Sequence, residues 1–286
     1  MKNLFIVALS LIIWPVFGQH KPQAYRITDA KGHRASYRKL IRKAAKADVV
    51  FIGELHNNPI AHWLELKITR DLYRKKNGKI ILGAEMFERD NQEALTKYVE
   101  GRSNAKELDS TARLWPNFKT DYKPLVDFAR EKKLEFVATN IPRRYASRVF
   151  HHGLASLDSL GSEEKQWIAP LPIAYDSTLS QYVKMRQMMP SHRGANLPKA
   201  QAVKDATMAH SIARHMKPGY TFIHYNGSFH SAFRQGIIWY LKRLKPEAKI
   251  LTIEVVEAED VKHLPEKYKG TADFIIIVDK DMTKTY

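Results

Sequence analysis

The sequence reads Ala47-Asp48-Val49-Val50-Phe51-Ile52-Gly53-Glu54-Leu55-His56, a mostly apolar run that ends in a Gly-x-x-His motif. The same arrangement returns at Tyr220-Thr221-Phe222-Ile223-His224-Tyr225-Asn226-Gly227-Ser228-Phe229-His230. Each run has the length and bulk of a buried strand. Because ligands bind at the carboxyl ends of strands in an open α/β sheet, two matched strand ends indicate one shared site. That site would hold two histidines and a glutamate.

Strands and helices are expected to alternate along the chain. The predicted strands are Ala47 to Gly53, Lys79 to Glu85, Leu134 to Thr139, Tyr220 to Tyr225, Lys249 to Val255 and Asp273 to Val278. One helix is capped by Asn58 and begins at Pro59, and the others are Asp90 to Glu100, Lys123 to Lys133, Arg143 to His151, Ser162 to Ile168, Ser177 to Met189, Pro198 to Met216 and His230 to Leu244. This alternation predicts an α/β fold with a mixed, largely parallel sheet flanked by helices. Because no strand is expected from Pro142 to Pro218, we predict a helical insertion or lid there.

The N-terminus carries a different pattern. Lys2 precedes an apolar stretch from Leu4 to Phe17, and small or modest residues follow where a signal peptidase would cut. This pattern predicts a secretory signal peptide over residues 1–18 and a single domain over residues 19–286. The stretch is too short for a membrane span, and no later run approaches the necessary length. We therefore expect a periplasmic or secreted protein with no transmembrane helix in the mature chain.

Composition narrows the classes of partner. Cysteine is absent, which excludes disulfides, a thiol nucleophile and the lipid-modified cysteine of bacterial lipoproteins. The formal net charge of +17 favours anionic ligands or surfaces. Alternatively, the basic residues lie on solvated helix faces, as at Arg38-Lys39 and Lys75-Lys76, and only keep the protein soluble. No motif combines aromatic and basic residues in the way nucleic-acid binding requires, so that partner is not expected.

Polar side chains at strand ends are the candidates for chemistry. Glu54 and His56 are two residues apart, so both point to the same side of an extended segment. Glu85 ends an apolar strand, where a buried carboxylate needs a positive partner or a metal. With His230, these residues form a ligand set for divalent zinc, manganese or cobalt, or a general acid and base around a substrate. The alternative for each residue is a structural polar group satisfied by backbone N–H groups.

Two helical residues extend this set. His62 lies about one turn into the helix that begins at Pro59, and it either reaches the crevice or is a buried structural histidine. Asp205 falls on the apolar face of its helix with Ala202 and Ala209, and an acid at that position needs a partner, such as a basic residue of the crevice.

Five motifs follow one another from about Val49 to Gly236. They are Phe51-Ile52-Gly53-Glu54-Leu55-His56-Asn57-Asn58-Pro59 with His62, Gly83-Ala84-Glu85-Met86-Phe87 with Gln92, Ala138-Thr139-Asn140-Ile141-Pro142-Arg143, Asp205-Ala206-Thr207-Met208-Ala209, and Asn226-Gly227-Ser228-Phe229-His230 with Gly236. Together they resemble the ChaN family of bacterial haem-binding proteins, which belongs to the Tiki superfamily. The resemblance implies a secreted or envelope protein of haem or iron uptake, able in some members to form a homodimer around stacked haems.

The resemblance also implies roles for particular residues. Glu54, His56, Glu85 and His230 would be the shared superfamily site, whether catalytic or structural. Many family members are lipoproteins, and because this chain has no cysteine, tethering to the outer membrane does not carry over.

Haem is therefore the expected cofactor and partner. Tyrosine and histidine are the usual ligands of captured haem iron, and the candidates in this chain are His62, Tyr182 and His192. Lysines and arginines around the site would pair with the two haem propionates. The alternative is a metal-dependent hydrolase, a peptidase or an esterase as elsewhere in the superfamily, in which the four site residues bind a divalent metal or activate water.

Overall fold

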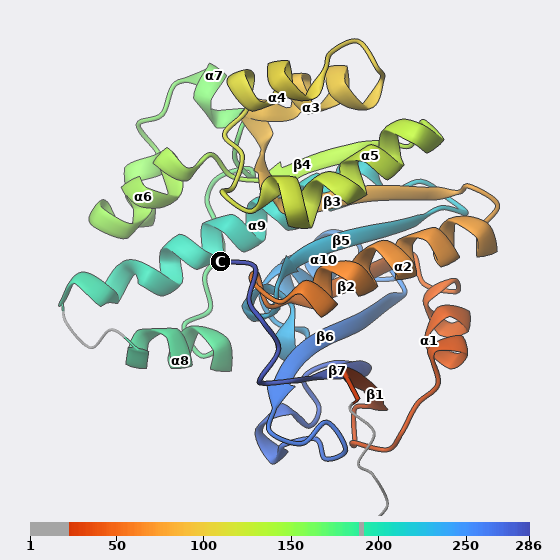
Figure 1. The fold of residues 1–286 in the computed structure, drawn as a ribbon. Helices are drawn as coiled ribbons and strands as arrows, with labels where there is room; N and C mark the ends of the chain where they lie inside the picture. The colour runs from red at the N-terminus through yellow and green to blue at the C-terminus, as the bar shows by residue number, and fades with distance from the viewer. Residues whose placement is uncertain (1–22, 189–191) are drawn as a thin grey trace, which may run out of the picture.

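A seven-stranded sheet forms the centre of the protein (Figure 1). The computed structural model describes residues 23–188 and 192–286. The strand order is β1-β7-β6-β2-β5-β3-β4, and every neighbouring pair is parallel except β1 and β7. The strands are β1 Tyr25–Asp29, β2 Val49–Glu54, β3 Ile80–Glu88, β4 Phe136–Asn140, β5 Thr221–Gly227, β6 Ile250–Ala258 and β7 Phe274–Asp279. The predicted α/β fold with a mixed, largely parallel sheet is confirmed.

The two Gly-x-x-His motifs end neighbouring strands. β2 and β5 pair in parallel near the centre of the sheet, and their register places Glu54 beside Gly227. Both strands are buried along their whole length. Burial on two faces explains why they read as largely continuous apolar runs instead of alternating ones. The motifs therefore emerge side by side from one edge of the sheet.

Helices cover both faces of the sheet. Val50 and Ile52 on β2 pack into one core, and Val49 and Phe51 on the same strand pack into another. The first core is covered by α1 (Tyr37–Ala44), α2 (Pro59–Lys75), α3 (Gln92–Val99), α4 (Ala105–Thr111) and α5 (Lys123–Lys132), and the second by α9 (Leu197–His215) and α10 (Ile237–Leu244). Successive side chains of the strand thus enter opposite cores, as the two-residue period of a strand requires.

Helix α2 begins as predicted. The Asn58 side chain accepts hydrogen bonds from the backbone N–H groups of Ile60 and Ala61, both at 3.1 Å. Pro59 occupies the first helical position, where an N–H group would have no partner within the helix. This cap fixes the direction in which the chain leaves the first Gly-x-x-His motif and places His62 one turn into the helix.

The segment between β4 and β5 is helical, as predicted, and its described residues contain no strand. Its elements are α6 (Arg143–His152), η3 (Leu154–Leu157), α7 (Ser162–Lys165), α8 (Ser180–Met188), η4 (His192–Asn196) and α9. Figure 1 shows α6 and α8 on either side of α9, at the left of the view beside the sheet, and α7 above α6. Val149 of α6 and Leu157 of η3 pack against Val203 of α9 in a small separate core. Met189, at the end of a predicted helix, lies outside the described residues.

The predicted helix from His230 to Leu244 is wrong in its first half. The chain there forms two 3-10 turns, η5 (Ser228–His230) and η6 (Ala232–Arg234), and α10 starts only at Ile237. Phe233 has a φ of 56°, which is incompatible with a continuing helix. Gly236 has a φ of 55°, and a Cβ there would lie 2.4 Å from the carbonyl oxygen of His230. The interrupted helix thus folds back closely against His230.

The remaining short elements are η1 (Arg89–Asn91), the π-helical turn η2 (Phe118–Tyr122) and η7 (Glu266–Tyr268). No helix among residues 23–188 and 192–286 is long and apolar enough to cross a membrane. The predicted signal peptide over residues 1–18 lies outside the described residues.

Candidate functional site

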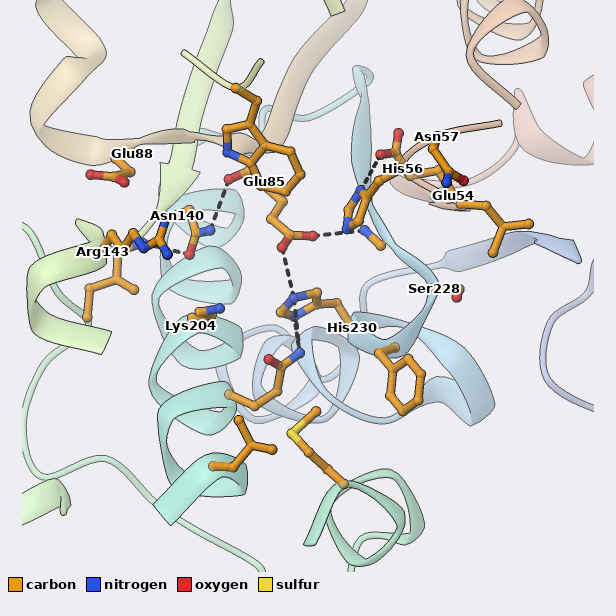
Figure 2. A pocket seen from close by; sticks show the side chains of 18 of the residues that line it. Glu54, His56, Asn57, Glu85, Glu88, Asn140, Arg143, Lys204, Ser228 and His230 are labelled. Carbon is orange, nitrogen blue, oxygen red and sulfur yellow. Dashed lines mark hydrogen bonds and ion pairs between the residues drawn. The ribbon is translucent and has the colours of Figure 1, made fainter. Parts of the chain in front are cut away.

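A cleft of about 840 Å³ lies at the carboxyl ends of β2, β3 and β5, beside helices α8 and α9 (Figure 2). Glu54, His56, Glu85 and His230 all line it, so the structure brings together the four residues that the sequence singled out. A cleft of this volume lies within the range typical of small-molecule and cofactor sites. The topology explains the meeting, because the three strands are adjacent and parallel.

His230 is held between two carboxylates. Its Nε2 lies 3.0 Å from Oε1 of Glu85 on β3, and its Nδ1 lies 2.5 Å from Oδ1 of Asp205 on α9. The Tyr182 hydroxyl donates to Oδ2 of Asp205 at 2.7 Å. The backbone N–H of Gly227 donates to Oε2 of Glu85 at 2.8 Å. Each acid therefore has a partner on both of its oxygens, and the partner that Asp205 was expected to need is His230.

Burial and neighbouring charges shift the pKa values of His230 and Glu85 in opposite directions. Burial alone would lower the pKa of His230, but the Glu85 and Asp205 carboxylates together raise it to about 9. Burial would likewise raise the pKa of Glu85, yet His230 holds it well below its usual range. At neutral pH the unit is an imidazolium between two acids. Both ring nitrogens then donate hydrogen bonds, so His230 has no lone pair to offer a metal.

His56 is the more open of the two motif histidines. Its side chain is 34% exposed, and its Nδ1 lies 2.6 Å from Oε1 of Glu54, which also accepts a hydrogen bond from Tyr122 at 2.7 Å. Burial would lower the pKa of His56, but the hydrogen bond that its Nδ1 donates to Glu54 and the charge of Glu85 raise it overall. No hydrogen bond within residues 23–188 and 192–286 engages its Nε2. That nitrogen is the free imidazole donor or acceptor of the cleft.

The glycine of the second motif makes this arrangement possible. A Cβ on Gly227 would lie 2.8 Å from Nε2 of His56 and 3.6 Å from Oε2 of Glu85. A contact of 2.8 Å with a methyl group is too close for any real side chain. The His56 ring can therefore approach the end of β5 only because residue 227 has no side chain.

Two of the three haem-ligand candidates point away from the cleft. The His62 side chain is 4% exposed, and its Nδ1 lies 3.1 Å from Oε2 of Glu65 behind Glu54. Tyr182 is buried and donates to Asp205 beneath His230. Neither lines the cleft, so iron ligation by either one would require its side chain to leave these partners. His192 begins η4, and its side chain is outside the described part of the structure.

The cleft also contains residues that the sequence analysis did not assign to it. Gln201 lies four residues before Asp205 on α9, so helical spacing from Asp205 would have identified it, and Lys204 lies three residues after Gln201. The Gln201 amide nitrogen lies 2.9 Å from Nδ1 of His230. Trp115 and Tyr286 come from distant segments of the chain, and no local pattern marks them.

The walls of the cleft combine apolar and cationic groups. Trp115, Phe229, Met185 and Met188 supply aromatic and thioether surface, and Arg143 and Lys204 supply positive charge. Neither cation forms a salt bridge or a side-chain hydrogen bond with another residue of the described chain. Figure 2 shows both lying on the same side of the cleft, beside Asn140. The arrangement suits a largely apolar ligand that carries negative charge at one side.

Comparisons with known proteins indicate the family to which this fold and cleft belong. A profile of the family described as "Haem-binding uptake, Tiki superfamily, ChaN" matches residues 40–241, more than half of the chain. Among curated proteins, the chain is 26% identical over 192 residues to Protein RETICULATA-RELATED 5, chloroplastic, of Arabidopsis thaliana. That match covers 62% of this chain and 26% of the plant protein, so the chain spans about a quarter of its length.

Among solved structures, one described as "Cofacial heme binding to ChaN of Campylobacter jejuni" has a TM-score of 0.66 and 19% sequence identity, covering 89% of this chain and 96% of that one. It shows that the fold is shared. A mutant of the erythromycin esterase EreC in its open conformation gives a TM-score of 0.47 at 11% identity, covering 82% of this chain and 77% of that one. Since the family profile covers more than half of the chain and includes β2, β3, β4 and β5 entirely, the chain belongs to the ChaN family of haem-binding uptake proteins within the Tiki superfamily.

Proposed function

We propose that this protein binds haem in the cleft at the carboxyl ends of β2, β3 and β5 and acts in haem or iron uptake. The observation that carries the proposal is the composition of the cleft in a chain of this family. Haem is a flat apolar molecule with two carboxylates on one edge. The aromatic and thioether walls match its face, and the two unpaired cations Arg143 and Lys204 match its propionates.

The residues present fit haem in a specific way. His56 offers a free Nε2 into the cleft, and Tyr286 lines the same space with 65% of its surface exposed. Among the histidines and tyrosines that line the described cleft, these are the two whose donor atoms are open. His230 is not such a residue, because both of its nitrogens are engaged by acids. When bound, haem would supply an iron centre that one of these donors would hold.

Two further parts of the proposal concern the oligomeric state of the protein and its location. The solved ChaN relative is described by its cofacial haem binding, which supports a homodimer of the present chain that brings two haems together. The apolar pattern at residues 1–18 supports export to the periplasm or the exterior. In either location the protein would be able to bind haem that comes from outside the cell.

The test is a haemin titration of the protein from Gln19 onward, followed by absorbance of the Soret band. We expect saturable binding, weakened about tenfold or more in an Arg143→Ala and Lys204→Ala double variant, because charge-assisted hydrogen bonds contribute about 1.5–3 kcal/mol each. An Arg38→Ala and Arg42→Ala double variant removes the same charge from exposed positions on α1 and should bind as the wild type does. Equal weakening in both variants would mean non-specific attraction by net charge and would contradict the proposal.

The iron donor is identified in the same titration. His56→Ala and Tyr286→Phe each remove one candidate, and the variant that changes the position of the Soret band identifies the ligand. If neither variant changes the spectrum, the iron is held by another residue, and His192 is the next candidate.

A metal-dependent hydrolase is supported less well by this geometry. In that alternative Glu54, His56, Glu85 and His230 would hold a divalent ion, which requires neutral imidazoles with free lone pairs. His230 lies between two carboxylates that keep it charged. Absence of specific haemin binding, together with ester or peptide turnover lost in Glu85→Gln, would support this function instead.

A further inference from the structure

A second cluster of ionisable residues lies beneath the cleft, on the far side of Glu54. Glu54 ends β2, and His62 and Glu65 lie on the first two turns of α2. Each offers one ligand atom, and these atoms all lie within 4.8 Å of one another. All three residues are buried, at 1%, 5% and 0% exposure. The carboxylates and the imidazole thus share a small space closed to solvent.

The cluster has more acceptors than donors. Oε2 of Glu54 and Oε1 of Glu65 are buried and accept no hydrogen bond from an N–H group, although Oε2 of Glu54 lies 3.5 Å from Nδ1 of His62 and the two carboxyl groups are placed to share a proton. Oδ1 of the neighbouring Asn117 also has no hydrogen-bond partner. A buried carboxylate oxygen without a partner is costly, because it has lost its water and gained nothing in return. Two such carboxylate oxygens beside one histidine indicate that a positively charged group belongs between them.

The charges lead to the same conclusion. Asp121 joins the cluster, with Oδ2 at 3.5 Å from Nε2 of His62. The ion pairs that the described residues offer to Glu54, Glu65 and Asp121 are all with histidines, namely His56 and His62. Ionised together, the three acids would exceed the two imidazolium charges, one of which, His56, also faces Glu85 in the cleft. Burial and the charge of Glu54 accordingly raise the pKa of Glu65 well above its ordinary value. A positive charge added between Glu54 and Glu65 would offset the excess.

The orientation of His62 identifies where that charge would lie. Its Nε2 lies 3.1 Å from the backbone carbonyl oxygen of His56, which can only accept a hydrogen bond. Burial lowers the pKa of His62, but Glu65, Glu54 and Asp121 raise it to about 9, so an ion would bind Nδ1 in place of its proton. Unlike His230, which has an acid on each nitrogen, His62 keeps Nε2 on a backbone carbonyl when Nδ1 loses that proton. The Nδ1 atom of His62 lies 3.1 Å from Oε2 of Glu65 and 3.5 Å from Oε2 of Glu54. Metal-binding histidines are commonly oriented in this way, with one nitrogen on a backbone carbonyl and the other on the ion.

We infer that Glu54, His62 and Glu65 form a binding site for one divalent first-row transition-metal ion, of the class of Zn²⁺ or Mn²⁺. One imidazole nitrogen and two carboxylate oxygens suit such ions. Metal–ligand bonds of about 2.0–2.2 Å would draw the three ligands slightly closer than they lie here. The ion would reach them past Glu54, which also lines the cleft. This inference does not rest on haem binding.

The site has a consequence for the cleft above it. The Oε1 atom of Glu54 holds Nδ1 of His56 at 2.6 Å, and its Oε2 atom faces the inferred ion. A metal on the second oxygen would fix the carboxylate and, through it, the ring of His56. In this arrangement Glu65 is a positioning residue for the cleft and does not contact a ligand bound there.

The experiment is a titration of chelator-treated full-length protein with Co²⁺, followed by its visible d–d absorption and by isothermal calorimetry, then repeated with Zn²⁺. We expect one ion per chain in the wild type and a loss of affinity of at least about 10–100-fold in Glu65→Gln, which removes a ligand and keeps the shape. The matched control is Glu254→Gln, because Glu254 is also a buried glutamate on the sheet with an unpartnered oxygen but lies outside the cluster. Its metal binding should equal that of the wild type.

Two outcomes would overturn the inference. Absence of stoichiometric metal binding in the wild type would mean that a shared proton or a water molecule satisfies Glu54 and Glu65. Binding that survives Glu65→Gln but disappears in Glu85→Gln would place the ion in the cleft instead. The wild-type titration is decisive even if a variant fails to fold. Haemin binding by the metal-free protein is measured separately, so failure of one proposal is distinguishable from failure of the other.

Discussion

At the scale of single residues, the unit of Glu85, His230 and Asp205 determines the character of the cleft. It places one buried imidazolium between two buried acids. Such a unit stabilises the fold only while all of its members are present, because each partner compensates the burial of the others. The same charges remove His230 from the metal ligands and leave His56 as the accessible imidazole of the pair.

Replacing the central member should therefore destabilise the protein strongly. His230→Gln leaves Glu85 and Asp205 buried without their cation, and we expect the free energy of unfolding at pH 7 to fall by about 3–5 kcal/mol. The measurement is chemical denaturation. His263→Gln is the control, since His263 pairs with Asp260 at an exposed position, where substitutions usually change stability by less than about 0.5 kcal/mol. A similar small change in both variants would contradict the proposed strength of the unit.

The pH dependence of stability follows from the same residues. The folded-state pKa of His230 is about 9, above the ordinary value of 6.5. Its stabilisation is therefore fully present below pH 6.5 and is lost as pH rises towards 9. The groups that face it are Glu85, Asp205 and, across the cleft, His56. We expect the free energy of unfolding of the wild type to fall over this range relative to that of His230→Gln. Parallel curves for the two proteins would show that His230 does not titrate in this way.

At the scale of elements, the ends of β2 and β5 fit together through one missing side chain. Gly227→Ala would place a methyl group 2.8 Å from Nε2 of His56, so the ring must move away from Glu54. Because the contact is with the end of a side chain, we expect a small loss of stability, about 0.5–1.5 kcal/mol for one hydrogen bond. The larger expected effect is a weaker haemin affinity or a shifted Soret band.

The control for this change is Gly161→Ala. Residue 161 has a φ of −66°, and a Cβ there would meet only Oε2 of Glu164 at an ordinary 3.7 Å. Haemin binding by this variant should match that of the wild type. Unchanged haemin binding in Gly227→Ala would mean that the position of His56 does not matter to the ligand.

Some strands and helices were predicted from the sequence more accurately than others, and burial and long-range contacts explain the difference. The central strands β2 and β5 are buried on both faces, so their long apolar runs predicted them well. The edge strand β1 was not predicted, because Tyr25–Asp29 has only five residues and no continuous apolar run, and it is held by its antiparallel partner β7. The turns before α10 were mistaken for helix, since their apolar residues have helical spacing, while the backbone N–H of Phe233, which has a positive φ, donates to the carbonyl oxygen of the distant Thr271.

At the scale of the whole molecule, the same distinction applies to the candidate site. Glu54, His56, Glu85 and His230 were found from strand-end motifs, because parallel neighbours bring such ends together by topology alone. Trp115 lies between α4 and η2. Tyr286 follows β7 and is far along the chain from β2, β3 and β5, whose cleft it lines. Their positions depend on long-range packing that no local pattern records. Even Glu65 became a candidate only when burial showed that its oxygen has no partner.

The net charge of the whole molecule bears on the proposed haem-linked dimer. Each copy carries a formal charge of +17, so two copies repel each other at low ionic strength. Salt shortens the range of this repulsion to about 8 Å at 0.15 M. The propionates of bound haem would in addition neutralise part of the charge at Arg143 and Lys204, beside the cleft. Dimer formation should therefore require haem and strengthen with salt.

Sedimentation velocity tests this prediction directly. We expect the haem-free protein to remain monomeric from 20 to about 500 mM NaCl, and the haemin-saturated protein to shift towards dimer as salt increases. A protein that associates through exposed apolar surface alone would instead dimerise with salt in both states. A haemin-saturated protein that binds its ligand yet stays monomeric at every salt concentration would show that this chain captures haem as a single copy. In that case Arg143 and Lys204 would pair with the propionates of a single bound haem. The cofacial arrangement described for the Campylobacter jejuni relative would then not extend to this member of the family.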